Sequence, residues 1–98
     1  MSGGRIRIVK ALSNNRELYE YLVLLADKLK YRGFLELSET VRLASRHAAS
    51  NMVTEFLGES RIALRQLLQS GGDALAELEQ SELLDVLKQL DDALQRRW

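Results

Sequence analysis

Residues 17–29 form the most apolar stretch of this 98-residue chain. The leucines in the stretch recur at spacings of four, three and four, which places them on one face of an α-helix: Leu18, Leu22, Leu25 and Leu29. Tyr21 and Ala26 flank that face and widen it, so the polar side that remains is narrow. A helix that is apolar over so much of its circumference needs partners on more than one side. We therefore expect the other helices, or a second subunit, to pack around it.

The ends of this first helix are marked by residues that favour helix termini. Ser13, Asn14 and Asn15 are all able to cap its start, because a short polar side chain accepts a hydrogen bond from the first turn. Gly33 follows a cluster of basic residues at a place where helices commonly stop. The sequence therefore predicts a helix over residues 15–32.

The rest of the chain predicts further helices, over residues 38–57, 59–69 and 74–97. Ser38 is a suitable cap for the second helix, and Gly58 either ends that helix or only bends it, so 38–69 is one bent helix or two. The sequence Ser-Gly-Gly-Asp at 70–73 predicts a turn, with Asp73 able to cap the last helix. Ser81 allows a fresh start within that helix, so a break is expected near residue 80. Its leucines repeat the spacing of the first helix: Leu83, Leu87, Leu90 and Leu94.

These elements predict an all-α fold, a single-domain bundle of four to five helices with short loops that spans residues 1–98. Residues 1–4 are expected to be disordered, and residues 5–12 are compatible with a short helix or with a strand. The hydrophobic content of 46% is ordinary for a globular protein, and a chain of this length can bury a core without disulfide bonds.

Composition also limits the chemistry and the cellular location. The chain has no cysteine, which removes disulfide bonds, thiolate metal sites and thiol catalysis. The longest apolar run, residues 21–26, is too short to cross a bilayer, and the N-terminus lacks the apolar segment of a signal peptide. We therefore expect a cytoplasmic protein without a membrane partner.

No residue pattern predicts an enzyme. His47 is the only histidine, and Ser50 lies three residues further along a helix, but nothing in the sequence marks that serine as an activated nucleophile. The carboxylates are not spaced as a calcium loop or a di-metal helix pair, and the glycines do not form a phosphate-binding loop. We expect no catalytic, metal-binding or cofactor-binding residues and no cofactor.

Charge is distributed unevenly although the net charge is zero. Residues 1–49 carry nine basic and five acidic side chains, whereas residues 50–98 carry five basic and nine acidic ones. Such asymmetry is compatible with a nucleic-acid contact, or with faces that attract each other within the fold or across a dimer. The basic residues are scattered along the sequence, which favours the second interpretation.

The main functional prediction is association with other proteins, most simply as a homodimer. The first helix carries apolar residues beyond its leucine stripe, and the chain ends in a tryptophan that follows a leucine seam. The predicted interface residues are Tyr21, Val23, Leu24, Tyr31 and Trp98. The competing interpretation is a compact monomer whose extra apolar residues are simply scattered over the surface.

DNA binding is the alternative functional prediction. A hairpin over residues 52–69, with Gly58 in its turn, has the outline of a helix-turn-helix motif. The side chains that would contact DNA are Arg61, Arg65, Gln66 and Gln69. Glu55 and Glu59 oppose this prediction because they would repel phosphate, and the chain lacks the net positive charge typical of DNA-binding domains.

Overall fold

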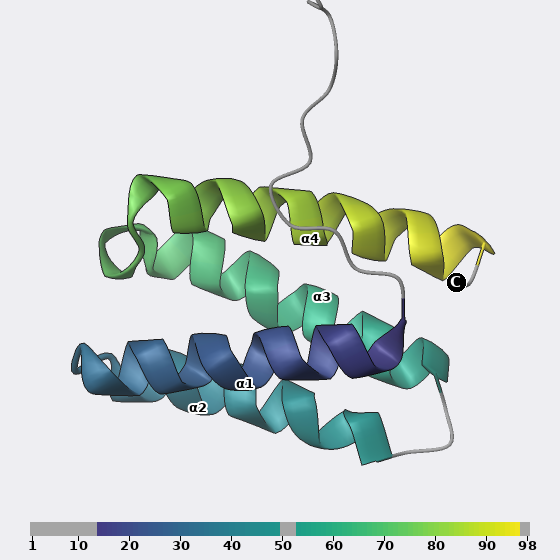
Figure 1. Ribbon diagram of the computed structural model, residues 1–98, viewed down its shortest axis with the longest axis horizontal. Coiled ribbons are helices and arrows are strands. Elements are labelled where there is room, and N and C mark those ends of the chain that lie inside the picture. The colour runs from purple at the N-terminus through teal and green to yellow at the C-terminus, as the bar shows by residue number, and fades with distance from the viewer. Residues whose placement is uncertain (1–13, 50–52, 97–98) are drawn as a thin grey trace, which may run out of the picture.

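Helices that alternate in direction make up the part of the chain that the computed structural model describes, residues 14–49 and 53–96. The four α-helices are α1 (Asn15–Tyr31), α2 (Leu35–Arg46), α3 (Val53–Ser70) and α4 (Glu77–Arg96). Two short 3₁₀ turns, η1 (His47–Ala49) and η2 (Gly72–Ala74), follow α2 and α3. The helices lie side by side as a bundle (Figure 1), which confirms the predicted all-α class. Within the described ranges there is no strand.

The apolar run that dominates the sequence lies at the centre of the core. Leu18, Leu22 and Leu29 of α1 are completely buried. They belong to one cluster with large side chains from the later helices, including Phe56, Leu57, Leu64, Leu67, Leu83, Val86 and Leu90. The chain pairs α1 with α2 and α3 with α4, and α2 packs against α3 to join the two pairs. The broad apolar surface of α1 is therefore largely used within the chain.

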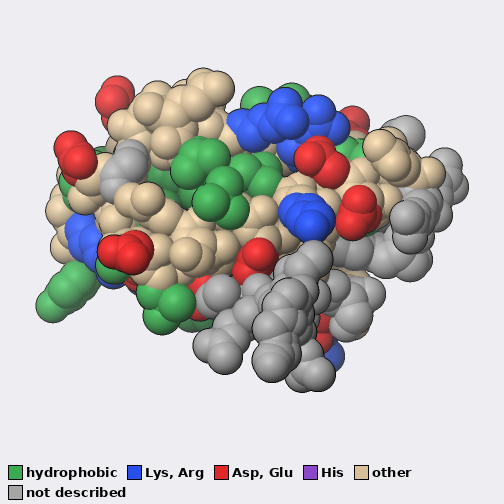
Figure 2. Space-filling view, turned by 90° about the horizontal axis from the view of Figure 1, so that it is seen from above, with side chains coloured by type: hydrophobic (Ala, Val, Ile, Leu, Met, Phe, Trp, Pro, Cys, Tyr) green, Lys and Arg blue, Asp and Glu red, His purple; other side chains and the backbone are tan. Residues whose placement is uncertain are grey.

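The buried face of α4 is rotated from the leucine stripe that its sequence suggests. Leu83 and Leu90 are completely buried, but Val86 completes the buried face and Leu87 is only partly buried. Leu84 is 53% exposed. Figure 2, which looks at the molecule from the side on which α4 lies in Figure 1, shows hydrophobic side chains gathered in a patch there. Part of the leucine content of α4 therefore faces solvent.

Both ends of α1 follow the sequence signals. The side chain of Asn14 accepts a hydrogen bond of 2.9 Å from the backbone N–H of Glu17, which identifies the cap among three candidates. Gly33 has a positive φ of 91°, a conformation that residues with a Cβ rarely adopt. The N–H of Phe34 then reaches back to the carbonyl of Leu29 at 2.8 Å. This is the hydrogen-bonded turn that commonly terminates helices.

The predicted boundaries at 38–57 and 59–69 are wrong. The second helix begins at Leu35 rather than at a Ser38 cap, and Ser38 lies inside it, buried, where its hydroxyl donates to the carbonyl of Ala26 at 2.7 Å. The chain leaves the α-helix after Arg46, so residues 38–69 contain two helices, but the second one passes through Gly58 without interruption. Glycine costs a helix about 1 kcal/mol relative to alanine. Burial of Phe56 and Leu57 beside it outweighs that cost.

The break expected near residue 80 is also absent, because α4 runs unbroken from Glu77 to Arg96. Its start is held by Glu79, whose carboxylate accepts the backbone N–H of Ala76 at 2.8 Å. A glutamate at this position reaching back to the cap residue is half of a capping box. Asp73, the expected cap, lies in η2 instead. Residues 1–4, residues 5–12 and Trp98 lie outside the described residues.

A pair of glycine substitutions tests the continuity of α3 at Gly58 and the turn that ends α1 at Gly33. Gly58→Ala is expected to stabilise the protein by about 1 kcal/mol, because a Cβ there meets no atom within 4 Å and alanine favours a helix interior. Gly33→Ala is expected to destabilise it by about 1–2 kcal/mol, because its φ of 91° is unfavourable for alanine. Urea unfolding of both variants measures the two effects. Destabilisation by Gly58→Ala would contradict a continuous α3.

Candidate interaction surface

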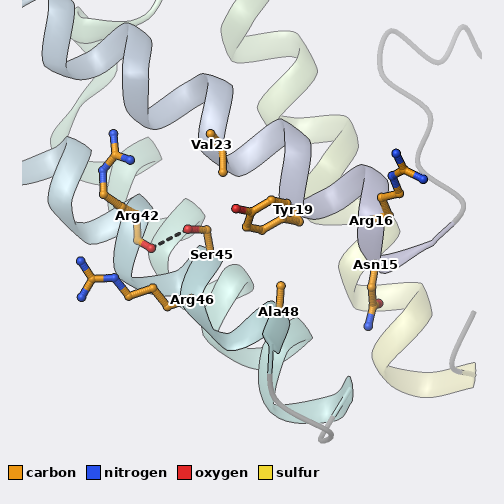
Figure 3. A pocket seen from close by; sticks show the side chains of 8 residues that line it. All are labelled: Asn15, Arg16, Tyr19, Val23, Arg42, Ser45, Arg46 and Ala48. Carbon is orange, nitrogen blue, oxygen red and sulfur yellow. Dashed lines mark hydrogen bonds between the residues drawn. The ribbon is translucent and has the colours of Figure 1, made fainter.

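A groove of about 800 Å³ separates the outer faces of α1 and α2. Its apolar part is lined by Tyr19 and Val23, one helical turn apart on α1, and by Ala48 of η1. Figure 3 shows the Tyr19 ring extending from α1 toward Ser45 of α2. The Ser45 hydroxyl already donates to the Arg42 carbonyl at 2.6 Å, so its proton is used within α2. The groove therefore offers mainly apolar surface to a partner.

Arginines flank this groove on both helices. Arg16 stands on the α1 side, while Arg42 and Arg46 extend from α2 (Figure 3). Two of them have acidic neighbours outside the groove: Arg42 Nη2 lies 2.9 Å from an Asp27 carboxylate oxygen, and Arg16 Nε lies 3.5 Å from a Glu20 one.

Those two ion pairs are largely exposed, so each holds its arginine only weakly. Arg46 has no ion pair within residues 14–49 and 53–96. The groove thus combines an apolar floor with a positively charged rim.

The predicted interface residues do not gather on one surface. Tyr21 is only 8% exposed, and its burial raises its pKa, with the charges of Glu82 and Glu79 raising it further. Val23 lies in the groove. Leu24 is 60% exposed and lies on the opposite flank of α1, which faces Glu82 of α4.

Tyr31 ends α1 and is 95% exposed, far along the helix from the groove. Of the four predicted interface residues that the structure describes, only Val23 therefore belongs to the candidate surface, and Tyr21 is a core residue.

The residues predicted to contact DNA lie on one uninterrupted helix, so the predicted helix-turn-helix geometry is wrong. Arg61 Nε lies 3.2 Å from an Asp91 carboxylate oxygen, which ties this arginine to α4. Arg65 and Gln69 are exposed, while Gln66 lies on the α2 side of α3 next to Thr40. DNA binding itself stays an untested prediction, but the hairpin on which it was based does not exist.

The single histidine has an acidic neighbour. His47 Nδ1 lies 3.3 Å from a carboxylate oxygen of Glu55, which links η1 to the first turn of α3. Ser50, the residue weighed as its nucleophile, is outside the described residues. Across 14–49 and 53–96, no group of three histidine or acidic side chains is arranged to hold a metal ion.

Most of the groove residues were missed by the sequence reasoning. The predicted interface included Val23 but neither Tyr19 nor the arginines of the rim. The signal that could have found them is a second stripe, Tyr19 and Val23 at a spacing of four, with Arg16 one turn before it. Ala48 could be placed only once the turn after α2 was known.

Comparisons with known proteins give no match: no family model, no curated protein and no solved structure is similar to this chain. Among the described helices, none has the length and apolar character required to span a membrane.

Proposed function

We propose that this chain is a non-enzymatic helical protein–protein interaction module that associates with copies of itself through apolar helix faces. The observation that supports the proposal is the α1–α2 groove, where apolar side chains are gathered and framed by arginines. Single exposed apolar residues are ordinary on protein surfaces, but contiguous apolar patches with a polar rim are typical of interaction sites.

The residue types of the groove suit this role. Tyrosine and arginine are enriched at the energetic centres of protein interfaces, since both present large contact areas together with polar groups. Tyr19 is 43% exposed in the single chain, so a partner would remove further apolar area from water. That burial contributes about 25 cal/mol for each Å² of apolar surface.

A cytoplasmic location is part of the same proposal. It is supported by the cysteine-free sequence, because proteins of the reducing cytosol need no disulfide bonds.

The proposal predicts that polar residues in the groove weaken self-association. The double variant Tyr19→Gln, Val23→Gln should raise the dissociation constant at least about tenfold, as loss of a central interface residue commonly does. Glutamine is a good helix former, so α1 should persist. Sedimentation equilibrium over a range of concentrations measures the effect, with circular dichroism as the check on folding.

Leu24→Gln is the matched control, because Leu24 is more exposed than Tyr19 yet lies on the other flank of the same helix. It should change the dissociation constant by less than about threefold if the groove is the interface. Equal effects of the control and the double variant would contradict the assignment of the groove. A wild-type chain that stays monomeric at every concentration would contradict self-association altogether.

A further inference from the structure

The outer face of α4 presents acidic side chains, whereas the groove is lined by arginines. Between Glu77 and Arg96 the helix carries six acidic side chains, of which Glu79 is paired with Arg32 and Asp91 with Arg61. Glu77 and Asp92 are exposed. Leu84 is 53% exposed on this helix and Leu87 is partly buried, so apolar side chains are presented among the acidic ones. Figure 2 shows the hydrophobic patch on this side of the molecule with charged side chains around it.

We propose that the outer face of α4 in one copy docks into the α1–α2 groove of a second copy. Leu84 would contact the apolar floor at Tyr19 and Val23, and the exposed carboxylates of α4 would face the arginine rim. Charge complementarity supports a second copy as the occupant, because arginines line the groove whereas exposed carboxylates lie on α4 of the same chain. This inference rests on the proposed self-association and specifies its geometry.

The two surfaces lie on different sides of the bundle, which determines the kind of assembly. The groove is formed by α1 and α2, whereas α4 packs on α3 at the other side (Figure 1). One copy therefore cannot use both surfaces on the same neighbour. The contact is heterologous, and a copy whose groove is filled still presents its own α4 face. Association should accordingly continue beyond the dimer as concentration rises, unless a ring closes.

Charge also predicts how this assembly responds to salt. Ion pairs at an exposed rim are screened when the Debye length falls to a few ångströms. Raising NaCl from about 0.05 to about 0.5 M should therefore weaken the association several-fold. Association that strengthens with salt would contradict a role for the arginine rim.

Complementary variants test the heterologous contact. The first is the groove double variant Tyr19→Gln, Val23→Gln, which retains the α4 face. The second is Leu84→Lys, which removes the exposed leucine, adds a positive charge among the acidic side chains and retains the groove. Each variant alone lacks one of the two required surfaces and is expected to be monomeric. An equimolar mixture should form a 1:1 complex that grows no further, with a dissociation constant within about threefold of the wild-type one.

Leu78→Lys is the control for the α4 variant, because it makes the same change at a position that is 62% exposed on the same helix. Leu78 lies six residues before Leu84, which places it more than 100° away around the helix. This control should self-associate like the wild type. Sedimentation velocity of each variant alone and of the mixture gives the masses, and circular dichroism confirms that all are helical.

Three outcomes would overturn the heterologous contact while leaving self-association intact. Leu84→Lys could associate like the wild type, which would mean that the groove contacts something other than α4. The mixture could stay monomeric, which would mean that the two surfaces are not complementary. Leu78→Lys could fail as Leu84→Lys does, which would mean that charge alone and not the Leu84 face is required. A monomeric wild type would instead overturn the proposed function.

Discussion

Leu22→Ala is expected to destabilise the protein by about 2–5 kcal/mol, the range measured for leucine truncation in packed cores. Leu22 is completely buried in the middle of α1 and belongs to the cluster that joins α1 to α3 and α4. Alanine removes apolar contacts and leaves a cavity that its neighbours fill only partly. Small domains are stable by only about 5–15 kcal/mol, so this single change removes a large share. Urea unfolding monitored by circular dichroism measures the loss.

Leu24→Ala is the matched control for this prediction. The residue type and the helix are the same, but Leu24 is 60% exposed. We expect a change of less than about 0.5 kcal/mol in the free energy of unfolding, as for most surface substitutions. Similar effects at both positions would mean that the buried face of α1 is not the one described.

Glu79→Gln is expected to lower the free energy of unfolding by about 1–2 kcal/mol at pH 7, after allowance for solvent screening of its partner Arg32, whose side chain is 36% exposed. Its carboxylate receives both terminal nitrogens of Arg32, at 2.7 and 2.9 Å, and the backbone N–H of Ala76 at 2.8 Å. Lys28 is the second cation at this carboxylate, with its Nζ 3.4 Å from an oxygen of Glu79. Arg32 also donates to the carbonyl of Ala74 at 2.8 Å. These contacts form a cluster around Glu79 that links the end of α1 to the start of α4.

The same contribution should depend on pH in a predictable direction. The hydrogen bonds and charge of Arg32 lower the pKa of Glu79 from 4.5 to about 2. A carboxyl with a depressed pKa in the folded state stabilises the fold above its unfolded pKa and loses that contribution as the pH falls. The stability difference between the wild type and Glu79→Gln should thus be constant above about pH 5 and shrink between about pH 4.5 and about pH 2.

Glu77→Gln is the control, because Glu77 is exposed in the same first turn of α4. It removes the same charge from the same helix terminus without touching Arg32. Its effect should be a few tenths of a kcal/mol, typical of a charge near a helix terminus. Equal losses at the two positions, or a Glu79→Gln difference that persists at pH 2, would contradict the assigned role of the cluster.

The predictions that succeeded rest on local signals. The leucine spacing in residues 17–29 and the glycine at 33 depend only on neighbours within one or two turns, and the structure has both features as expected. Sequence signals within one or two helical turns were therefore sufficient to predict the all-α class and the first helix.

The predictions that failed depend on packing between distant residues. Gly58 carries a local signal for a turn, but its helix is held by Phe56 and Leu57 in the core. Ser38 carries a capping signal, but its hydroxyl is used by Ala26 of another helix, twelve residues away. The burial of Phe56 and Leu57 and the contact between Ser38 and Ala26 both depend on how the helices pack, which the local sequence does not reveal.

The candidate surface was predictable only in part. Val23 was predicted because it is apolar and outside the main stripe. Its neighbour Leu24, chosen for the same reason, turned out to face the opposite flank, since adjacent residues on a helix point about 100° apart. The groove also needs Arg42 and Arg46 of α2, and their place beside α1 follows only from how the two helices pack.

The measurement that tests the central claim most directly is the mass of the wild-type protein in solution as a function of concentration, by sedimentation equilibrium. We predict masses that rise with concentration above that of the 11.2 kDa chain, first to a dimer and then beyond it. A mass that stays at that of one chain up to millimolar concentration would contradict self-association and, with it, the role assigned to the α1–α2 groove.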